Sequence, residues 1–276
     1  MSCSYGQGVL SVLRKHYGLK SPHVVIGSSG SAANAAYYVA DQTDDAERIW
    51  LEKTTQPEFI RPKKGGFGKI IDIDLLVDGF IKDQVRLEIE KVLASPTELL
   101  ITATELQTAA TKHFSNRNIG NNLYEALRAS KAIPGAYGKS VEIDGIKYID
   151  GDLSTSLVDN IRQAVLMGCG TVIAINNNNG YLNVEKAGIL ANCFTNLQAM
   201  RAIGKRLRKK VFQKKENHNG TNVIVVKPGS RLPTSTLNNS PEAVSKSLRQ
   251  GTTEAMEHQG LESFFNARSK GQSIHA

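Results

Sequence analysis

The segment His23–Ala40, HVVIGSSGSAANAAYYVA, constrains the fold more than any other part of this sequence. Three β-branched residues run directly into a corner of small residues, and an alanine-rich stretch follows at once; the corner is Gly27, Ser28, Ser29, Gly30 and Ser31. This order predicts a short buried strand, a tight turn and a helix that starts at the turn. Two explanations for the serines stay open: one caps the helix, or one is a nucleophile exposed on a strand-to-helix corner.

The alternation of strands and helices continues along the chain. Strands are predicted at 97–106, 171–175 and 221–228, a hairpin at 140–152, and helices at 8–17, 31–41, 121–133, 158–168 and 182–210. This pattern indicates an α/β fold, with three α/β/α layers around a mainly parallel central sheet. We expect one domain over residues 1–276, which ends in a helical segment and tail at 229–276.

The composition excludes several classes of protein. Of 276 residues, 40% are hydrophobic and 22% charged, which is ordinary for a globular chain, and no apolar run is long enough to span a bilayer. Cys3, Cys169 and Cys193 are few, odd in number and widely spaced, which argues against a disulfide framework or a zinc site. With no signal peptide in view, we expect a cytoplasmic protein, with peripheral membrane attachment or secretion as an effector as the alternatives.

The net charge of +8 is concentrated in Arg201–Lys215, RAIGKRLRKKVFQKK, which holds eight basic residues and no acid. One interpretation is a solvated helix face; the other is a surface for phospholipid headgroups or nucleic acid. Only Phe212 offers an aromatic ring nearby, so a nucleic-acid partner is not expected.

A nucleophilic Ser29 would need a base to take its proton. None of the six histidines stands in a motif, although His258 falls late enough in the chain to follow the Ser-Asp-His order of α/β-hydrolases. A carboxylate is the other candidate, because Asp150-Gly151-Asp152 closes the predicted hairpin. Asp-Gly is equally typical of a turn, and position alone leaves the choice open.

Several segments now stand in one order: GVLSVLRK, VVIGSSGSAANAAYYVA, IDIDLLVDGFI, SPTELLITATEL, ALRASKAIPGAYG, VEIDGIKYIDGDLSTS, AVLMGCGTVIAI and NVIVVKP. Together they resemble the bacterial branch of the patatin-like phospholipase family, from about Gly8 to Pro228. The serine corner, ALRASKAIPG and YIDGD in this order are far more specific than any one of them.

The resemblance implies a lipid acyl hydrolase with a Ser–Asp dyad, no histidine base, no metal and no cofactor. Ser29 matches the family's nucleophile and Asp150 the aspartate of its Asp-Gly-Gly/Ala motif, with Asp152 in place of the last small residue. Backbone N–H groups of Gly30 and Cys3 are the expected oxyanion donors. The implied partners are a phospholipid or other acyl ester and, through Arg201–Lys215, an anionic membrane surface.

The chain departs from the family at its start. Family members open with a strand and a glycine-rich turn, and the register places only the last positions of that turn at Met1, Ser2 and Cys3. We therefore expect a truncated sequence with weak or no activity, since one lost oxyanion donor typically costs ~10²–10³-fold in kcat. The alternatives are a hydrolase of small soluble esters and a non-catalytic patatin-like protein that binds lipid or a partner.

Overall fold

The computed structural model describes residues 1–62, 69–178, 220–235 and 237–269. Its strands are β1 (Val24–Ser28), β2 (Ile60–Pro62), β3 (Lys69–Ile71), β4 (Glu98–Glu105), β5 (Thr111–Ser115), β6 (Val141–Ile143), β7 (Ile146–Asp150), β8 (Thr171–Ile175) and β9 (Asn222–Val226). Its α-helices are α1 (Cys3–Lys15), α2 (Gly30–Val39), α3 (Thr43–Arg48), α4 (Ile89–Ala94), α5 (Leu123–Ser130), α6 (Leu157–Leu166), α9 (Pro241–Met256) and α10 (Gln259–Ser269). The π-helical segments η1 (Ile49–Lys53) and η2 (Leu75–Gln84), and the 3₁₀ turns η3 (Gly120–Asn122) and η4 (Gly151–Leu153), complete the set.

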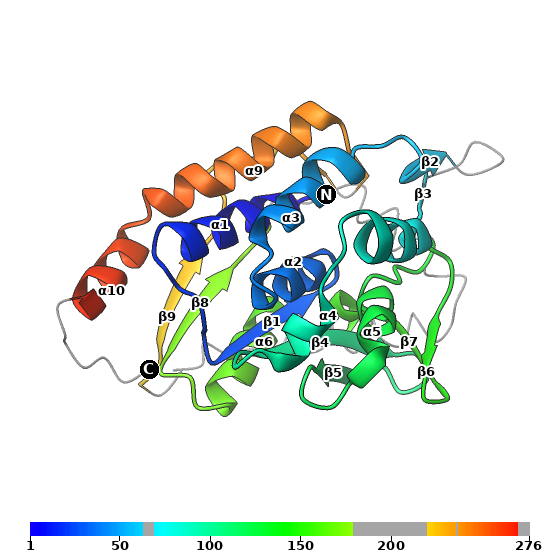
Figure 1. Cartoon of the computed structure of the whole chain (residues 1–276), viewed down its shortest axis with the longest axis horizontal. Helices are drawn as coiled ribbons and strands as arrows, with labels where there is room; N and C mark the ends of the chain where they lie inside the picture. The colour runs from blue at the N-terminus through cyan, green and yellow to red at the C-terminus, as the bar shows by residue number, and fades with distance from the viewer. Residues whose placement is uncertain (63–68, 179–219, 236, 270–276) are drawn as a thin grey trace.

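The three-layer α/β/α arrangement is the one expected from the sequence. α2 and α5 pack against one another and against β4, while α6 packs against β8 and β1. In Figure 1, α1 and α9 lie above the strands and α6 below them. Burial of apolar faces explains the layers, because α2 is almost entirely buried and β4 is buried along its centre.

The central sheet is organised around β4. β1 runs parallel to β4, with Ser28 opposite Thr102, and β5 pairs antiparallel along the other edge of β4. β7 also pairs antiparallel with β4, and its last residue, Asp150, lies opposite Ala103. β5 overlaps both β1 and β7 in its register on β4, so β1 and β7 must share the opposite edge. The carboxyl ends of β1 and β7 therefore meet there, end to end.

A second parallel pair, β8 and β9, is joined to the first sheet through helices. α6 contacts both β8 and β1. Figure 1 shows α9 running along α1, and glycines allow the close approach: a Cβ on Gly8 would collide with the Leu248 backbone, and one on Gly251 with the Tyr5 backbone. The C-terminal helices are therefore packed into the fold, and Leu261 of α10 is fully buried beside α1 and β9.

The predicted strands and the hairpin are confirmed, with small shifts at their ends. Sequence analysis missed β5, whose five residues carry little strand signal and depend on pairing with β4. The helix predicted at 121–133 ends at Ser130, after which the chain turns toward the serine corner. Residues 182–210 and Arg201–Lys215 lie outside the described residues. Within the part of the chain that the structure describes, no helix has the length and apolar character needed to cross a bilayer.

Candidate active site

The corner between β1 and α2 holds Ser29 in an unusual backbone conformation. Its φ is 52° and its ψ is −127°, a region that non-glycine residues rarely occupy. The surrounding contacts fix this conformation: the Ser29 N–H donates to Ser130 Oγ at 2.9 Å, and the Ser29 carbonyl oxygen accepts from the Ala32 N–H at 3.1 Å. Such strain costs ~1–3 kcal/mol and persists where neighbouring groups hold it in place.

Small residues around Ser29 let the helix start directly against the strand. A Cβ on Gly27 would lie 2.7 Å from Ala32 Cα and 2.9 Å from Ala35 Cβ, closer than side chains pack. The Ser31 hydroxyl donates to the Ser28 carbonyl oxygen at 2.6 Å and accepts from the Ser28 N–H at 3.2 Å. Ser31 therefore ties the turn together at the position where the common elbow pattern has glycine.

The end-to-end meeting of β1 and β7 brings Ser29 and Asp150 together. Ser29 Oγ donates to Asp150 Oδ2 at 2.7 Å, a short charge-assisted hydrogen bond. Gly151 follows in the crowded junction, where a Cβ would collide with the Thr102 backbone and lie 2.7 Å from Ser28 Oγ. The glycine after Asp150 is thus required by the close approach of the strands, in addition to any turn preference.

Burial makes Asp150 a stronger base than an ordinary aspartate. Its side chain is almost fully buried, and loss of solvation together with the nearby Asp152 charge raises the pKa of Asp150 to about 7. Hydrogen bonds from Ser29 and from the Asp152 N–H, which reaches Asp150 Oδ1 at 2.9 Å, oppose that rise. Asp152 therefore has two effects: its carboxylate raises the pKa of Asp150, and its backbone N–H orients the Asp150 carboxyl group.

The two residues expected to supply oxyanion donors, Gly30 and Cys3, lie side by side. Gly30 is the first residue of α2, so its N–H has no acceptor inside the helix, and none of the described residues accepts it. The Cys3 side chain, at the start of α1, packs over this glycine: a Cβ on Gly30 would lie 2.8 Å from Cys3 Sγ. The amino ends of α1 and α2 thus converge beside Ser29, and both favour negative charge there.

Ser130 and Lys131 are site residues that the sequence pattern did not predict. Ser130 is fully buried and its hydroxyl accepts the Ser29 N–H, while Lys131 is 4% exposed and its ammonium donates to the Ser29 carbonyl oxygen at 3.0 Å. Burial lowers the pKa of Lys131 to about 8, although the nearby Cys3 and Asp150 oppose that fall. The sequence did hold a signal: a single lysine between small residues in ASKAI.

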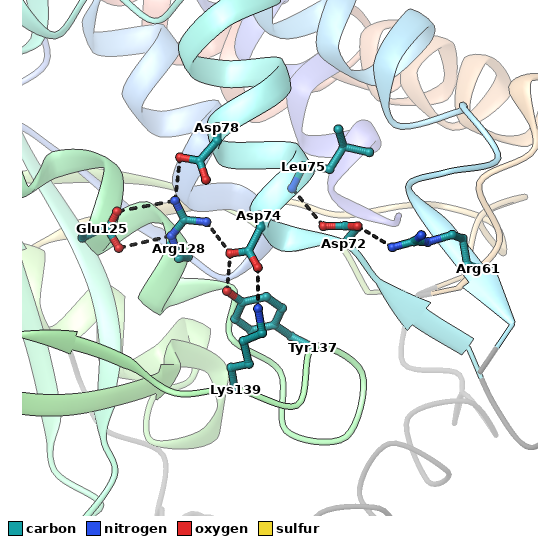
Figure 2. A network of polar contacts seen from close by, with 9 residues as sticks. All are labelled: Arg61, Asp72, Asp74, Leu75, Asp78, Glu125, Arg128, Tyr137 and Lys139. Carbon is teal, nitrogen blue, oxygen red and sulfur yellow. Dashed lines mark hydrogen bonds and ion pairs between the residues drawn. The ribbon is translucent and has the colours of Figure 1, made fainter. Parts of the chain in front are cut away.

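Figure 2 shows a network of charges that anchors α5, the helix that ends at Ser130 just before Lys131. Arg128, near the end of α5, bonds Asp74 at 2.5 Å and Asp78 at 2.8 Å, and both aspartates belong to the η2 region. The Tyr137 hydroxyl and the Lys139 ammonium reach the same Asp74 from the segment that follows α5. Because Arg128 is nearly buried, these bonds fix the end of α5 and the turn that delivers Lys131 to Ser29.

No histidine contacts Ser29 among the described residues. His258, the alternative base, lies between α9 and α10, with Nε2 3.2 Å from the Val225 carbonyl oxygen and Nδ1 accepting the Leu261 N–H. Within the described ranges, no group of three or more His, Cys, Asp or Glu side chains is placed to hold a metal ion. Among the described residues, Ser29 is therefore paired with the carboxylate of Asp150 and with no histidine.

Comparisons with known proteins give a family match for the part of the chain that holds this site. The family model described as patatin-like phospholipase matches residues 1–161, which include Ser29 and Asp150. A curated relative, "Uncharacterized protein YjjU" of Escherichia coli (strain K12), is 28% identical over 154 residues. That match covers 54% of this chain and 42% of the relative, so the chain spans less than half of the relative's length.

The raised pKa of Asp150 makes stability depend on pH. Between about pH 4 and about pH 7 the folded chain keeps a proton that the unfolded chain has released, so stability falls as pH rises through this window. Asp150→Asn removes this titration, and its free energy of unfolding relative to the parent should rise over the window by on the order of a few kcal/mol at most. Urea unfolding at a series of pH values measures the difference.

The matched control is Asp144→Asn in the exposed turn of the same hairpin, which should show no such trend. A difference between Asp150→Asn and the parent that stays constant with pH would contradict the assignment of a buried, proton-holding Asp150.

Proposed function

Because this chain belongs to the patatin-like phospholipase family, we propose that it is a lipid acyl hydrolase that works through the Ser29–Asp150 dyad. The family is one of esterases and phospholipases that act on lipid esters. The observation that carries the proposal for this chain is the 2.7 Å hydrogen bond from Ser29 Oγ to Asp150 Oδ2. A serine on a strained strand-to-helix corner, bonded to a buried carboxylate, has both a nucleophile and a base.

The proposed reaction has two acyl-transfer steps. Asp150 takes the Ser29 proton as Ser29 Oγ attacks the ester carbonyl carbon, and the negative charge on the acyl oxygen is bound by the Gly30 N–H and the amino ends of the two helices. Collapse of this intermediate breaks the ester bond, and the leaving alcohol receives the proton from Asp150. Water then attacks the acyl-enzyme and Asp150 takes its proton. The bond between the acyl carbon and Ser29 Oγ breaks, Ser29 Oγ receives the proton from Asp150, and the fatty acid leaves.

The pKa of Asp150 suits this role. A general base works best when its pKa lies near the working pH, and burial raises the pKa of Asp150 to about 7. An exposed aspartate would be ionised but too weak a base to draw a serine proton.

A fluorophosphonate probe tests the proposal before any substrate is chosen. We expect a covalent adduct on Ser29, mapped by mass spectrometry, that is absent in Ser29→Ala. Labelling should slow by about 10²-fold or more in Asp150→Asn, the range in which loss of a general base falls. His258→Ala is the matched control and should label at the parental rate, because His258 lies away from Ser29.

Lack of any Ser29 adduct would contradict the hydrolase proposal and favour the non-catalytic, lipid-binding alternative. If His258→Ala labels slowly and Asp150→Asn labels at the parental rate, the result would contradict the Ser29–Asp150 dyad. The weak activity expected for this chain stays a prediction, which the labelling rate of the parental chain measures.

We also propose peripheral contact with anionic membranes through Arg201–Lys215, which rests on the eight basic residues of that segment. Each basic residue near an anionic surface contributes about 1 kcal/mol, and salt screens this attraction. The chain should sediment with phosphatidylserine-containing vesicles at low salt and be released as salt rises, while pure phosphatidylcholine vesicles leave it in solution. Equal sedimentation with both vesicle types would contradict the electrostatic contact. A variant with glutamine at Lys209, Lys210, Lys214 and Lys215 that sediments as much as the parent would contradict it too.

A further inference from the structure

Lys131 is a buried cation with no part in the reaction described above. Its side chain is 4% exposed, and its ammonium bonds the carbonyl oxygen of Ser29 at 3.0 Å. Burying an ammonium group is costly unless a partner or a function compensates for the lost hydration. Among the described residues Lys131 has no ion pair that meets a direct salt-bridge distance, so ordinary charge pairing does not account for its position.

Lys131 contacts the carbonyl oxygen of Ser29, and this contact affects the neighbouring oxyanion donor. The carbonyl group of Ser29 belongs to the peptide unit whose N–H is that of Gly30, the expected oxyanion donor. A cation on the oxygen side of a peptide withdraws electrons from it and makes its N–H a stronger donor. The same bond restrains ψ of Ser29, which lies at −127° in the strained elbow.

The surroundings of Lys131 come from three elements. Asp150 at the end of β7 and the Cys3 thiol at the start of α1 both act on its charge. Asp152 in η4 lies beside Asp150 and is the further carboxylate of this cluster. The Asp150 N–H donates to the carbonyl oxygen of Ala132, the residue after Lys131, at 3.0 Å. From this neighbouring position the Lys131 charge favours the ionised form of Asp150, against burial and the Asp152 charge.

We propose that Lys131 is a positioning residue of the Ser29–Asp150 site: its buried ammonium holds and polarises the Ser29–Gly30 peptide, and its charge keeps Asp150 in the proton-accepting form. The inference rests on the proposed function. It assigns no proton transfer to Lys131, because the lysine contacts the Ser29 carbonyl oxygen and the aspartate accepts the hydroxyl.

The proposal predicts the shape of the pH–rate profile. Asp150 must be ionised, so activity rises as pH passes the pKa of Asp150; Lys131 must keep its proton, so activity falls as pH passes the pKa of Lys131, which burial lowers to about 8. The two groups interact, so the midpoints belong to the cluster as a whole. The parent should therefore show a narrow bell for kcat/KM on a p-nitrophenyl ester.

Lys131→Met keeps most of the length of the side chain and removes the charge. The alkaline fall should disappear, and the acidic midpoint should move up by about one pH unit or more, the size of effect that a nearby opposite charge produces. On the acidic side this corresponds to about a ten-fold or greater loss of kcat/KM. At the optimum kcat should fall while KM stays close to the parental value, because the polarised N–H acts on the developing oxyanion.

Lys147→Met is the matched control, since it removes an equal charge from β7, the strand that ends at Asp150, but from an exposed side chain. Its profile should keep the parental midpoints. A Lys131→Met enzyme whose rate falls by one factor at every pH, with both midpoints unmoved, would overturn the proposal and leave Lys131 a purely structural residue.

A second readout needs no turnover. The infrared carbonyl band of a protonated carboxylic acid, identified by its loss in Asp150→Asn, titrates Asp150 directly. In Lys131→Met this titration should move to higher pH, whether or not the chain hydrolyses esters. An unmoved band overturns the linkage between Lys131 and Asp150. Absence of Ser29-dependent hydrolysis with a moved band refutes the hydrolase and leaves the linkage standing.

Discussion

The contact between Ser29 and Asp150 depends on how two strands share one edge of β4. β1 arrives parallel to β4 and stops at Ser28; β7 arrives antiparallel and stops at Asp150, one residue further along β4. At this junction the ends of two strands far apart in sequence place a hydroxyl and a carboxylate 2.7 Å apart. The strained turn at Ser29 and the absence of a side chain at Gly151 both follow from this crowding.

The site is costly to the fold, and the surrounding residues stabilise it. A buried aspartate, a buried lysine and a strained serine backbone each oppose folding. The opposing contacts are local and specific: Ser130 accepts the Ser29 N–H, and the Arg128 network anchors the helix that carries Ser130. Backbone strain and buried charges that occur together, and that surrounding residues stabilise, are typical of an active site.

The local pattern of the sequence was enough to predict the strand, the corner and the helix around Ser29, because small residues and β-branched residues act over a few positions. The choice between Asp150 and His258 as the base was beyond position alone, because it depends on which edge of β4 accepts β7. The burial of Lys131 also depends on tertiary structure and could not be predicted from the local pattern. Lysine is usually exposed, and the turn after α5 places this one inside the protein. The packing of α9 on α1 likewise joins the two ends of the described chain.

The most direct measurement is a double-mutant cycle on ester hydrolysis with Ser29→Ala, Asp150→Asn and the pair. If Ser29 and Asp150 act as one unit, each single variant should lose nearly as much activity as the double variant, because either change alone disables the dyad. Losses that multiply in the double variant would contradict the account, since the two residues would then contribute independently. An Asp150→Asn variant with parental activity would contradict it most strongly.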